Sequence, residues 1–148
     1  MIGRRYLLDN NVLPRLTVEQ RRSDFVVENC RVPSEVLHEA RFLPDIEKLL
    51  TLEYPTTGRV LRHLMVVMSR VPIGDTALVD LYKNRGNADP LLVACALDGL
   101  EEADEGLFGL DWVVVSDDGA VQGMCADFGI VTLTSVDFLR FLTSRLTD

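Results

Sequence analysis

Short apolar runs typical of buried strands alternate along this chain with longer segments of helical periodicity. The clearest run is Trp-Val-Val-Val at 112–115, whose continuous β-branched residues favour a strand buried on both faces. Further strands are predicted at 4–8, 30–32 and 130–133. Strands that alternate with helices predict an α/β fold with a mainly parallel sheet covered on both faces.

Helices are predicted between these strands from apolar spacing and from capping residues. Ser34 is the predicted N-cap of a helix that runs to residue 43, and Gly129 suits the position just after a helix at 119–127. No repeat or linker interrupts the chain, so residues 1–148 are expected to form one domain. The remaining helical segments are 10–15, 17–28, 59–70, 75–82, 89–100 and 136–146, with a turn at 83–86.

Composition narrows the class of protein. The chain has 148 residues, is 47% hydrophobic, and contains no apolar run long enough for a membrane span or a signal peptide, so we expect a cytoplasmic protein with a real core. Its three cysteines, Cys30, Cys95 and Cys125, are odd in number and far apart, which favours free thiols. The net charge is −8, whereas proteins that hold nucleic acid through nonspecific phosphate contacts are usually basic. Any role on nucleic acid therefore has to rest on a local site and a bridging metal.

Four acidic residues lie at predicted strand ends, or at a helix start or border nearby. Asp9 follows the first strand, Asp118 follows the strand at 112–115, and Asp89 opens a helix. Glu39 lies nearer than Glu35 to the apolar face of its helix. Because the carboxyl ends of parallel strands share one edge of a sheet, we expect these four acids to converge there. Gathered carboxylates repel one another unless a hard cation lies between them, and their oxygens suit Mg²⁺ or Mn²⁺.

Each of these acids also has a structural explanation when it is taken alone. Asp9 and the pair Asp117-Asp118 suit capped turns after strands. Asp89 followed by Pro90 suits a helix N-cap. Capping and metal binding are compatible, because a helix N-terminus can hold a carboxylate that still faces a crevice. The functional interpretation rests on the four acids together.

Four blocks of the chain carry a family resemblance. They are Tyr6-Leu7-Leu8-Asp9-Asn10-Asn11-Val12-Leu13, the segment from Val32-Pro33-Ser34 to Glu39-Ala40, Asn87-Ala88-Asp89-Pro90-Leu91-Leu92-Val93-Ala94, and Val114-Val115-Ser116-Asp117-Asp118. In this order and spacing they resemble the PIN-domain family, in particular the single-domain toxins of the VapC kind. Asp9 and Asn11 match the family's Asp-Thr-Asn-Val signature, in which Asn10 replaces the usual hydroxyl residue. Ser116 and Asp118 match its Thr/Ser-x-Asp block.

The resemblance implies an α/β/α sandwich and a Mg²⁺- or Mn²⁺-dependent endoribonuclease, commonly a toxin that a small antitoxin protein silences and that tends to form a homodimer. The ion would polarise the scissile phosphate and activate a water for in-line attack. The implied ligands are Asp9, Glu39, Asp89 and Asp118, with Asn11 and Ser116 in support and Asp117 as an alternative fourth acid. The arginines considered for gripping phosphate are Arg41, Arg59 and Arg62.

Two alternatives stay open. The first is a catalytically degenerate PIN-like module that binds a partner and keeps the acids only as caps. The second is a haloacid-dehalogenase-like phosphatase, which also begins with an aspartate after its first strand. That chemistry needs a second acid two residues later, where this chain has Asn11, and a well-placed lysine, whereas only Lys48 and Lys83 are present.

Overall fold

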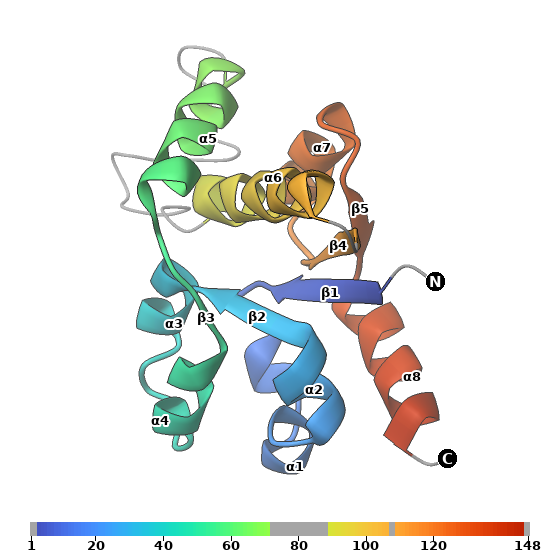
Figure 1. Ribbon diagram of the computed structural model, residues 1–148. Helices are drawn as coiled ribbons and strands as arrows, with labels where there is room; N and C mark the ends of the chain where they lie inside the picture. Colours follow the sequence, from blue (N-terminus) through green and yellow to red (C-terminus); the bar gives the residue numbers. More distant parts are fainter. Residues whose placement is uncertain (1–2, 72–88, 107–108, 147–148) are drawn as a thin grey trace.

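The computed structural model describes residues 3–71, 89–106 and 109–146. Its central sheet has five strands, all parallel, in the order β3-β2-β1-β4-β5. Helices cover both faces of this sheet, so the molecule is a three-layer α/β/α sandwich (Figure 1), and the predicted fold class is confirmed. The strands are β1 (Gly3–Leu8), β2 (Cys30–Pro33), β3 (Glu53–Tyr54), β4 (Leu110–Val115) and β5 (Val131–Leu133).

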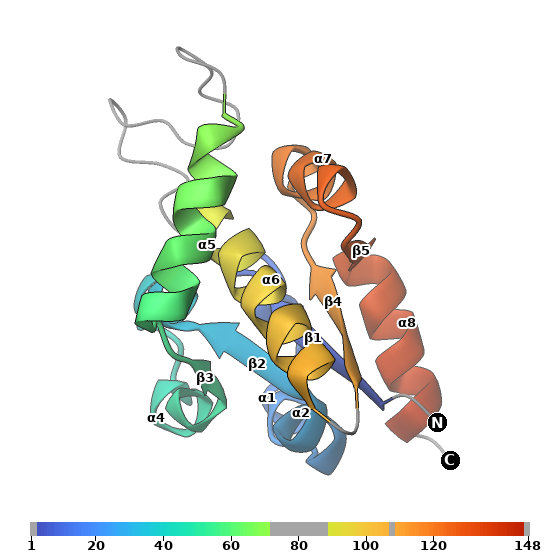
Figure 2. The same ribbon diagram turned by 45° about the horizontal axis from the view of Figure 1, so that its top comes forward.

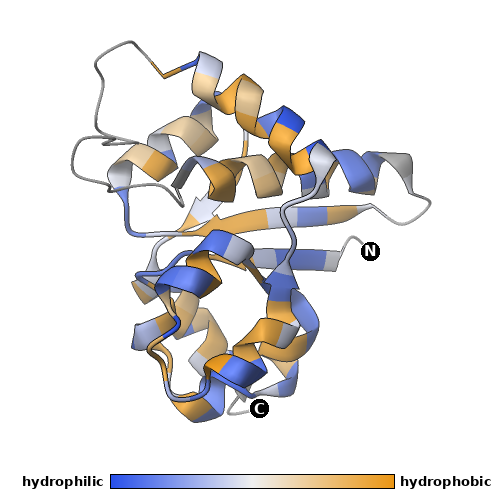
Figure 3. Ribbon diagram, turned by 90° about the vertical axis from the view of Figure 1, so that its left-hand side faces the viewer, coloured by the Kyte–Doolittle hydropathy of each residue, from blue (hydrophilic) through white to orange (hydrophobic). Residues whose placement is uncertain are grey.

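The helices divide into two groups, one on each face of the sheet. The upper group in Figure 1 is α5 (Gly58–Ser69), α6 (Asp89–Glu105) and α7 (Gly119–Asp127). The lower group is α1 (Val18–Arg21), α2 (Asp24–Asn29), α3 (Ser34–Glu39), α4 (Ile46–Leu49) and α8 (Ser135–Leu146), with the short 3₁₀ turns η1 (Leu13–Arg15) and η2 (Leu50–Leu52). Seen from the side, the strands lie between these two helical layers, whose helices carry both hydrophobic and hydrophilic residues (Figure 3).

Successive residues of the central strands point into two separate cores. Tyr6 and Leu8 of β1 pack into the core under the lower helices, whereas Leu7 packs into the core under the upper helices. In β4, Val113 and Val115 belong to the lower core and Val114 to the upper one. Both faces of β1 and β4 are therefore buried in their second halves, which explains why the continuous apolar run of β4 identifies it as a central strand.

The chain reverses its direction across the sheet between β1 and β4. Strands β1, β2 and β3 follow one another towards one edge, and β4 and β5 extend towards the other. In open parallel sheets such a reversal leaves a crevice at the carboxyl ends of the two central strands, where ligands bind. The residues that follow β1 and β4 are Asp9 and Ser116.

Several predicted helices differ from the structure in their bounds, and the one predicted at 89–100 continues to Glu105. The segment predicted as one helix at 17–28 is two helices, because Ser23 ends the first and caps the second by accepting a hydrogen bond from the backbone N of Val26. Ser34 was wrongly predicted as an N-cap: it is the first residue of α3, and its Oγ donates to the carbonyl oxygen of Tyr54 at 3.4 Å. Helix α3 ends at Glu39, four residues before the predicted end at 43.

Among the remaining predicted elements, some match the structure and others do not. The bounds predicted for α7 match, and Gly129 has a φ of 72°, a left-handed conformation that favours glycine after a helix. The helix predicted at 10–15 is only the turn η1, and α4, η2 and β3 were not predicted. The helix predicted at 75–82 and the turn at 83–86 lie outside the described residues.

Candidate active site

The carboxylate of Asp9 is buried at the end of β1 and held by two donors. The hydroxyl of Ser116 donates to its Oδ2 at 2.7 Å, and the backbone N of Asn10 donates to its Oδ1 at 2.7 Å. Only 4% of the residue is exposed. The backbone N of Asp9 also donates to the carbonyl oxygen of Val115 at 3.1 Å, so the pairing of β1 with β4 continues to this residue. The two central strands thus fix both the position and the orientation of this acid.

Ser116 connects Asp9 to the start of α7. Its side chain is buried, and its Oγ accepts a hydrogen bond from the backbone N of Asp118 at 3.1 Å while donating to Asp9. Asp118 is the N-cap of α7, where its Oδ1 accepts from the backbone N of Ala120 and of Val121. Both of these capping bonds end on Oδ1, so the cap leaves Oδ2 for other contacts.

The neighbouring acid, Asp117, is held by a different part of the fold. Its two oxygens accept from the backbone N and the hydroxyl of Ser135 at 2.7 and 2.6 Å, and Arg15 forms an ion pair with it at 3.8 Å. The bonds from Ser135 hold the pKa of Asp117 below its usual value. The backbone N of Asp117 donates to Oδ1 of Asn11 at 3.5 Å. Asp117 therefore fixes the start of α8, and Asn11 supports the turn between β4 and α7.

Electrostatics indicate which acids lie near one another. Burial raises the pKa of Asp9, the bonds from Ser116 and Asn10 oppose that rise, and the charges of Asp118 and Asp117 add to it. Partial burial likewise raises the pKa of Glu39, and the nearby charge of Asp9 raises it further. Asp9 and Glu39 are thus both harder to ionise than usual, partly because negative charges gather at this end of the sheet.

Three of the four predicted ligands, Asp9, Glu39 and Asp118, lie close enough that the charge of Asp118 raises the pKa of Asp9 and the charge of Asp9 raises the pKa of Glu39. For the fourth, Asp89, the structure describes the backbone. Asp9 and Asp118 are linked through Ser116, and Glu39 is the exposed last residue of α3. Asp89 begins α6, which runs antiparallel to the strands, so its first turn lies towards the carboxyl edge of the sheet (Figure 2). The side chain of Asp89 lies outside the described part of the chain. We refer to Asp9, Glu39, Ser116 and Asp118 together as the candidate site.

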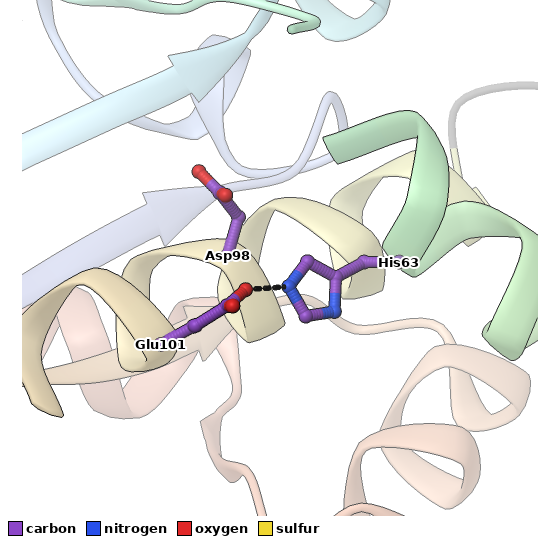
Figure 4. A group of neighbouring side chains, drawn as sticks. All are labelled: His63, Asp98 and Glu101. Carbon is purple, nitrogen blue, oxygen red and sulfur yellow. Dashed lines mark hydrogen bonds and ion pairs between the residues drawn. The ribbon is translucent and has the colours of Figure 1, made fainter. Parts of the chain in front are cut away.

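A second group of possible metal ligands, which the sequence did not indicate, lies between α5 and α6. His63, Asp98 and Glu101 each offer one ligand atom, and these atoms lie within 4.8 Å of one another. Nε2 of His63 and Oε2 of Glu101 are 2.5 Å apart, whereas the carboxylate of Asp98 points away from the imidazole (Figure 4).

The hydrogen bonds of this second group favour an ion-pair network over a metal centre. The hydroxyl of Tyr54 donates to Oδ2 of Asp98, and Nε of Arg59 donates to its Oδ1, both at 2.5 Å. The same guanidinium lies 3.9 Å from Glu101. An arginine already supplies the positive charge that a cation would bring, and it would repel one. The network instead joins α5 and β3 to α6, and it engages Arg59, one of the arginines considered for phosphate binding.

The remaining sequence predictions concern cysteines and membrane spans. Cys30, Cys95 and Cys125 are free and buried, which confirms the prediction of free thiols, and burial raises the pKa of each to about 12. These thiols are therefore protonated and unreactive near neutral pH. Of the helices that the structure describes, none has the length and apolar character needed to cross a bilayer.

Comparisons with known proteins do not assign a family. No protein-family model matches the chain, and no similar sequence was found among curated proteins.

Proposed function

We propose that this protein is a metal-dependent endoribonuclease of the PIN type. The observation that most supports the proposal is the chain of hydrogen bonds from Asp118 through Ser116 to Asp9. It links the ends of β1 and β4, where the direction of the sheet reverses and where ligands of parallel α/β folds bind. Ser116 and Asp118 are also the residues that match the Thr/Ser-x-Asp block of the family.

The residues of the candidate site fit Mg²⁺ or Mn²⁺. Their side-chain donors are all oxygens, and the raised pKa values of Asp9 and Glu39 mean that a nearby cation would be favourable. Ser116 and the backbone N of Asn10 hold the Asp9 carboxylate in one orientation, as groups behind a metal ligand commonly do. Asp89 is the proposed fourth ligand.

Different residues of the chain would have different roles in the proposed hydrolysis. A bound divalent ion would neutralise charge on the scissile phosphate and make a water more acidic. Asp9 and Asp118 are held by the fold and suit fixed ligands. Glu39 is exposed and has a raised pKa, so it suits proton exchange with the attacking water. Arg41 follows Glu39 by two residues, and Arg15 pairs with Asp117, so these two arginines are the proposed phosphate contacts.

Cleavage of RNA by the purified protein tests this proposal. With Mn²⁺ or Mg²⁺ the protein should cut single-stranded RNA, and EDTA should stop the reaction. Asp9→Asn and Asp118→Asn should each reduce the rate by about 100-fold or more, because each removes a charge needed to hold the ion. Asp117→Asn is the matched control and should retain cleavage, because Asp117 bonds to Ser135 at the start of α8. Cleavage that persists in both site variants would rule out the assignment.

We also propose, from the resemblance alone, that the protein is the toxin of a toxin–antitoxin pair and acts in the cytoplasm as a homodimer. Induced expression should then arrest growth, Asp89→Asn should relieve the arrest, and a small antitoxin protein should suppress it.

A melting temperature that does not change in millimolar Mg²⁺ or Mn²⁺ would favour the degenerate binding module instead, since an ion that binds only the native state raises that temperature.

A further inference from the structure

Phe42 is a large aromatic residue that folding leaves outside the core. It is 82% exposed and lies three residues beyond the end of α3. Single exposed apolar residues are common on protein surfaces and need no special explanation. Phe42 differs because it lines a small cavity together with Glu39 of the candidate site and with Asn10, the residue after Asp9.

This cavity places the ring of Phe42 beside one acid of the candidate site, Glu39. Its volume is about 170 Å³, and its other lining residues are Pro14, Ala40 and Leu43. Pockets that enclose a whole ligand usually measure roughly 300–1,000 Å³, so this one suits only part of a ligand. The lining is mostly apolar, and its polar residues are Glu39 and Asn10, whose backbone N donates to Asp9.

Arg41 brings a positive charge to the same place. Its guanidinium carbon lies 4.6 Å from the centre of the Phe42 ring, and its Nη1 donates to the carbonyl oxygen of His38 at 2.8 Å. Even with this neighbour, most of Phe42 remains exposed, so the ring has room for a second stacking partner. In a chain with a net charge of −8, a cation on an exposed ring marks a local surface suited to a polyanion that carries flat rings.

We propose that Phe42 and Arg41 form a platform on which one unpaired base of an RNA strand stacks, while the adjoining phosphate reaches the acids of the candidate site. This inference rests on the proposed nuclease function and makes it narrower. Every base has a flat face, so such stacking tolerates any sequence, and arginine adds a cation–π contact. In a duplex the bases are already stacked on one another, so the platform selects single-stranded over double-stranded RNA.

Binding measurements on a variant that cannot cut RNA test the platform. In the Asp9→Asn protein, kept in EDTA so that no strand is cut, the dissociation constant is measured by fluorescence anisotropy for labelled 12-nucleotide strands of oligouridylate and of oligoadenylate. Adding Phe42→Ala should weaken binding of both strands by about 5- to 150-fold, the loss expected for one stacked base. Adding Phe42→Trp should restore binding, because the indole keeps a stacking surface.

The matched control is Met65→Ala, which removes a side chain that is 73% exposed on α5. It should leave RNA binding unchanged. A strand of the same length without bases should bind Phe42→Ala and its parent equally, and a 2-aminopurine probe should lose fluorescence on binding only when an aromatic residue occupies position 42.

The outcomes separate this inference from the proposed function. If the wild-type protein cuts RNA but Phe42→Ala binds both strands as tightly as its parent, the platform is wrong and the nuclease stands. If Phe42→Ala binds RNA normally but no longer holds a protein partner, the ring is a protein-docking residue and the inference is overturned. If the Asp9→Asn protein does not bind RNA and the wild-type protein does not cut it, the proposed function and this inference fail together.

Discussion

At the scale of single residues, one hydroxyl organises the candidate site. Ser116 donates to Asp9 and accepts from the backbone of Asp118, so it fixes two acids that come from different strands of the sheet. Burial and the neighbouring acids nevertheless make Asp9 costly to ionise. The fold therefore maintains a carboxylate in a place that disfavours its charge, which is common at functional sites.

This cost predicts how Asp9→Asn changes stability with pH. A raised pKa means that the folded state binds a proton more tightly than the unfolded state, so ionised Asp9 destabilises the fold above its folded-state pKa. Without divalent ions, Asp9→Asn should therefore melt at a higher temperature than the parent at pH 8. The difference should shrink as the pH falls and the parent's Asp9 takes up a proton.

Calorimetry in EDTA between pH 8 and pH 4 measures this difference, and Asp137→Asn, an exposed acid on α8, is the control. Added Mg²⁺ should stabilise the parent and not the Asp9→Asn protein. A variant that melts below its parent at pH 8 in EDTA would contradict the electrostatic argument.

Sequence could predict some of these residues and not others. Asp9 and Ser116 stand out because each directly follows a strongly apolar strand, and parallel strands end at one edge. Asp117 and Asp118 are equivalent on local grounds, since both suit a capped turn. Their difference comes from Ser135, which lies 18 residues further along the chain. Neither the network of Asp98 with Arg59 and Tyr54 nor the exposure of Phe42 has a local sequence signal.

At the scale of elements, the close contact of α6 with β4 holds the upper helical layer on the sheet. Gly99 lies where this contact is tightest: a Cβ added there would be 2.6 Å from the indole ring of Trp112. The ring belongs to a central strand and packs edge-on against Tyr54, so it has little room to move. A glycine inside a helix normally lowers stability, but at position 99 any larger side chain would clash with the Trp112 ring.

Gly99→Ala should consequently destabilise the protein by about 1–3 kcal/mol through overpacking. The matched change is Gly123→Ala in α7, where an added Cβ meets nothing within 4 Å. That variant should be more stable than the parent by about 0.5–1 kcal/mol, because alanine loses less backbone entropy in a helix. Urea denaturation of both variants measures the two effects, and equal effects of the same sign would show that the α6–β4 contact is looser than described.

The elements that the sequence predicted best are those with local boundary signals. Helix α7 is bounded by Asp118 as its cap and by Gly129 after its end, and its predicted bounds match. Strand β3 has only two residues and no periodicity of its own, so nothing local identifies it. It exists because Val32 and Pro33 of β2 supply a partner. Such pairing is a tertiary effect that overrides weak local preference.

At the scale of the whole molecule, a net charge of −8 limits how the proposed RNA substrate could bind. Because this charge does not attract a polyanion at long range, the proposed RNA affinity would have to come from a bound ion, from stacking, and from a few local cations. Arg15, which pairs with Asp117 next to Asp118, and Arg41, which follows Glu39 by two residues, are the two proposed phosphate contacts.

Two phosphate contacts predict a shallow salt dependence. For single strands the logarithm of the binding constant falls with the logarithm of salt concentration by about 0.7 per contact, so a slope of about −1.4 is expected. Arg41→Gln should reduce this slope by about 0.7, and Arg140→Gln, an exposed arginine on α8, should leave it unchanged. The slope is obtained from anisotropy titrations of the Asp9→Asn protein at several NaCl concentrations, and a slope near −4 or steeper would contradict so small a set of cations.

The order of the strands also governs when the candidate site can assemble during synthesis. Ser116 and Asp9 are separated by 107 positions in the sequence. Strand β1 is synthesised first, and it can pair with its central neighbour β4 only after β4 has been synthesised. A ribosome must therefore produce most of the polypeptide before these two groups can meet, because contacts distant in sequence form only after long loops close. A partly translated chain holds Asp9 without its hydroxyl partner Ser116, so the candidate site stays incomplete until translation is nearly finished.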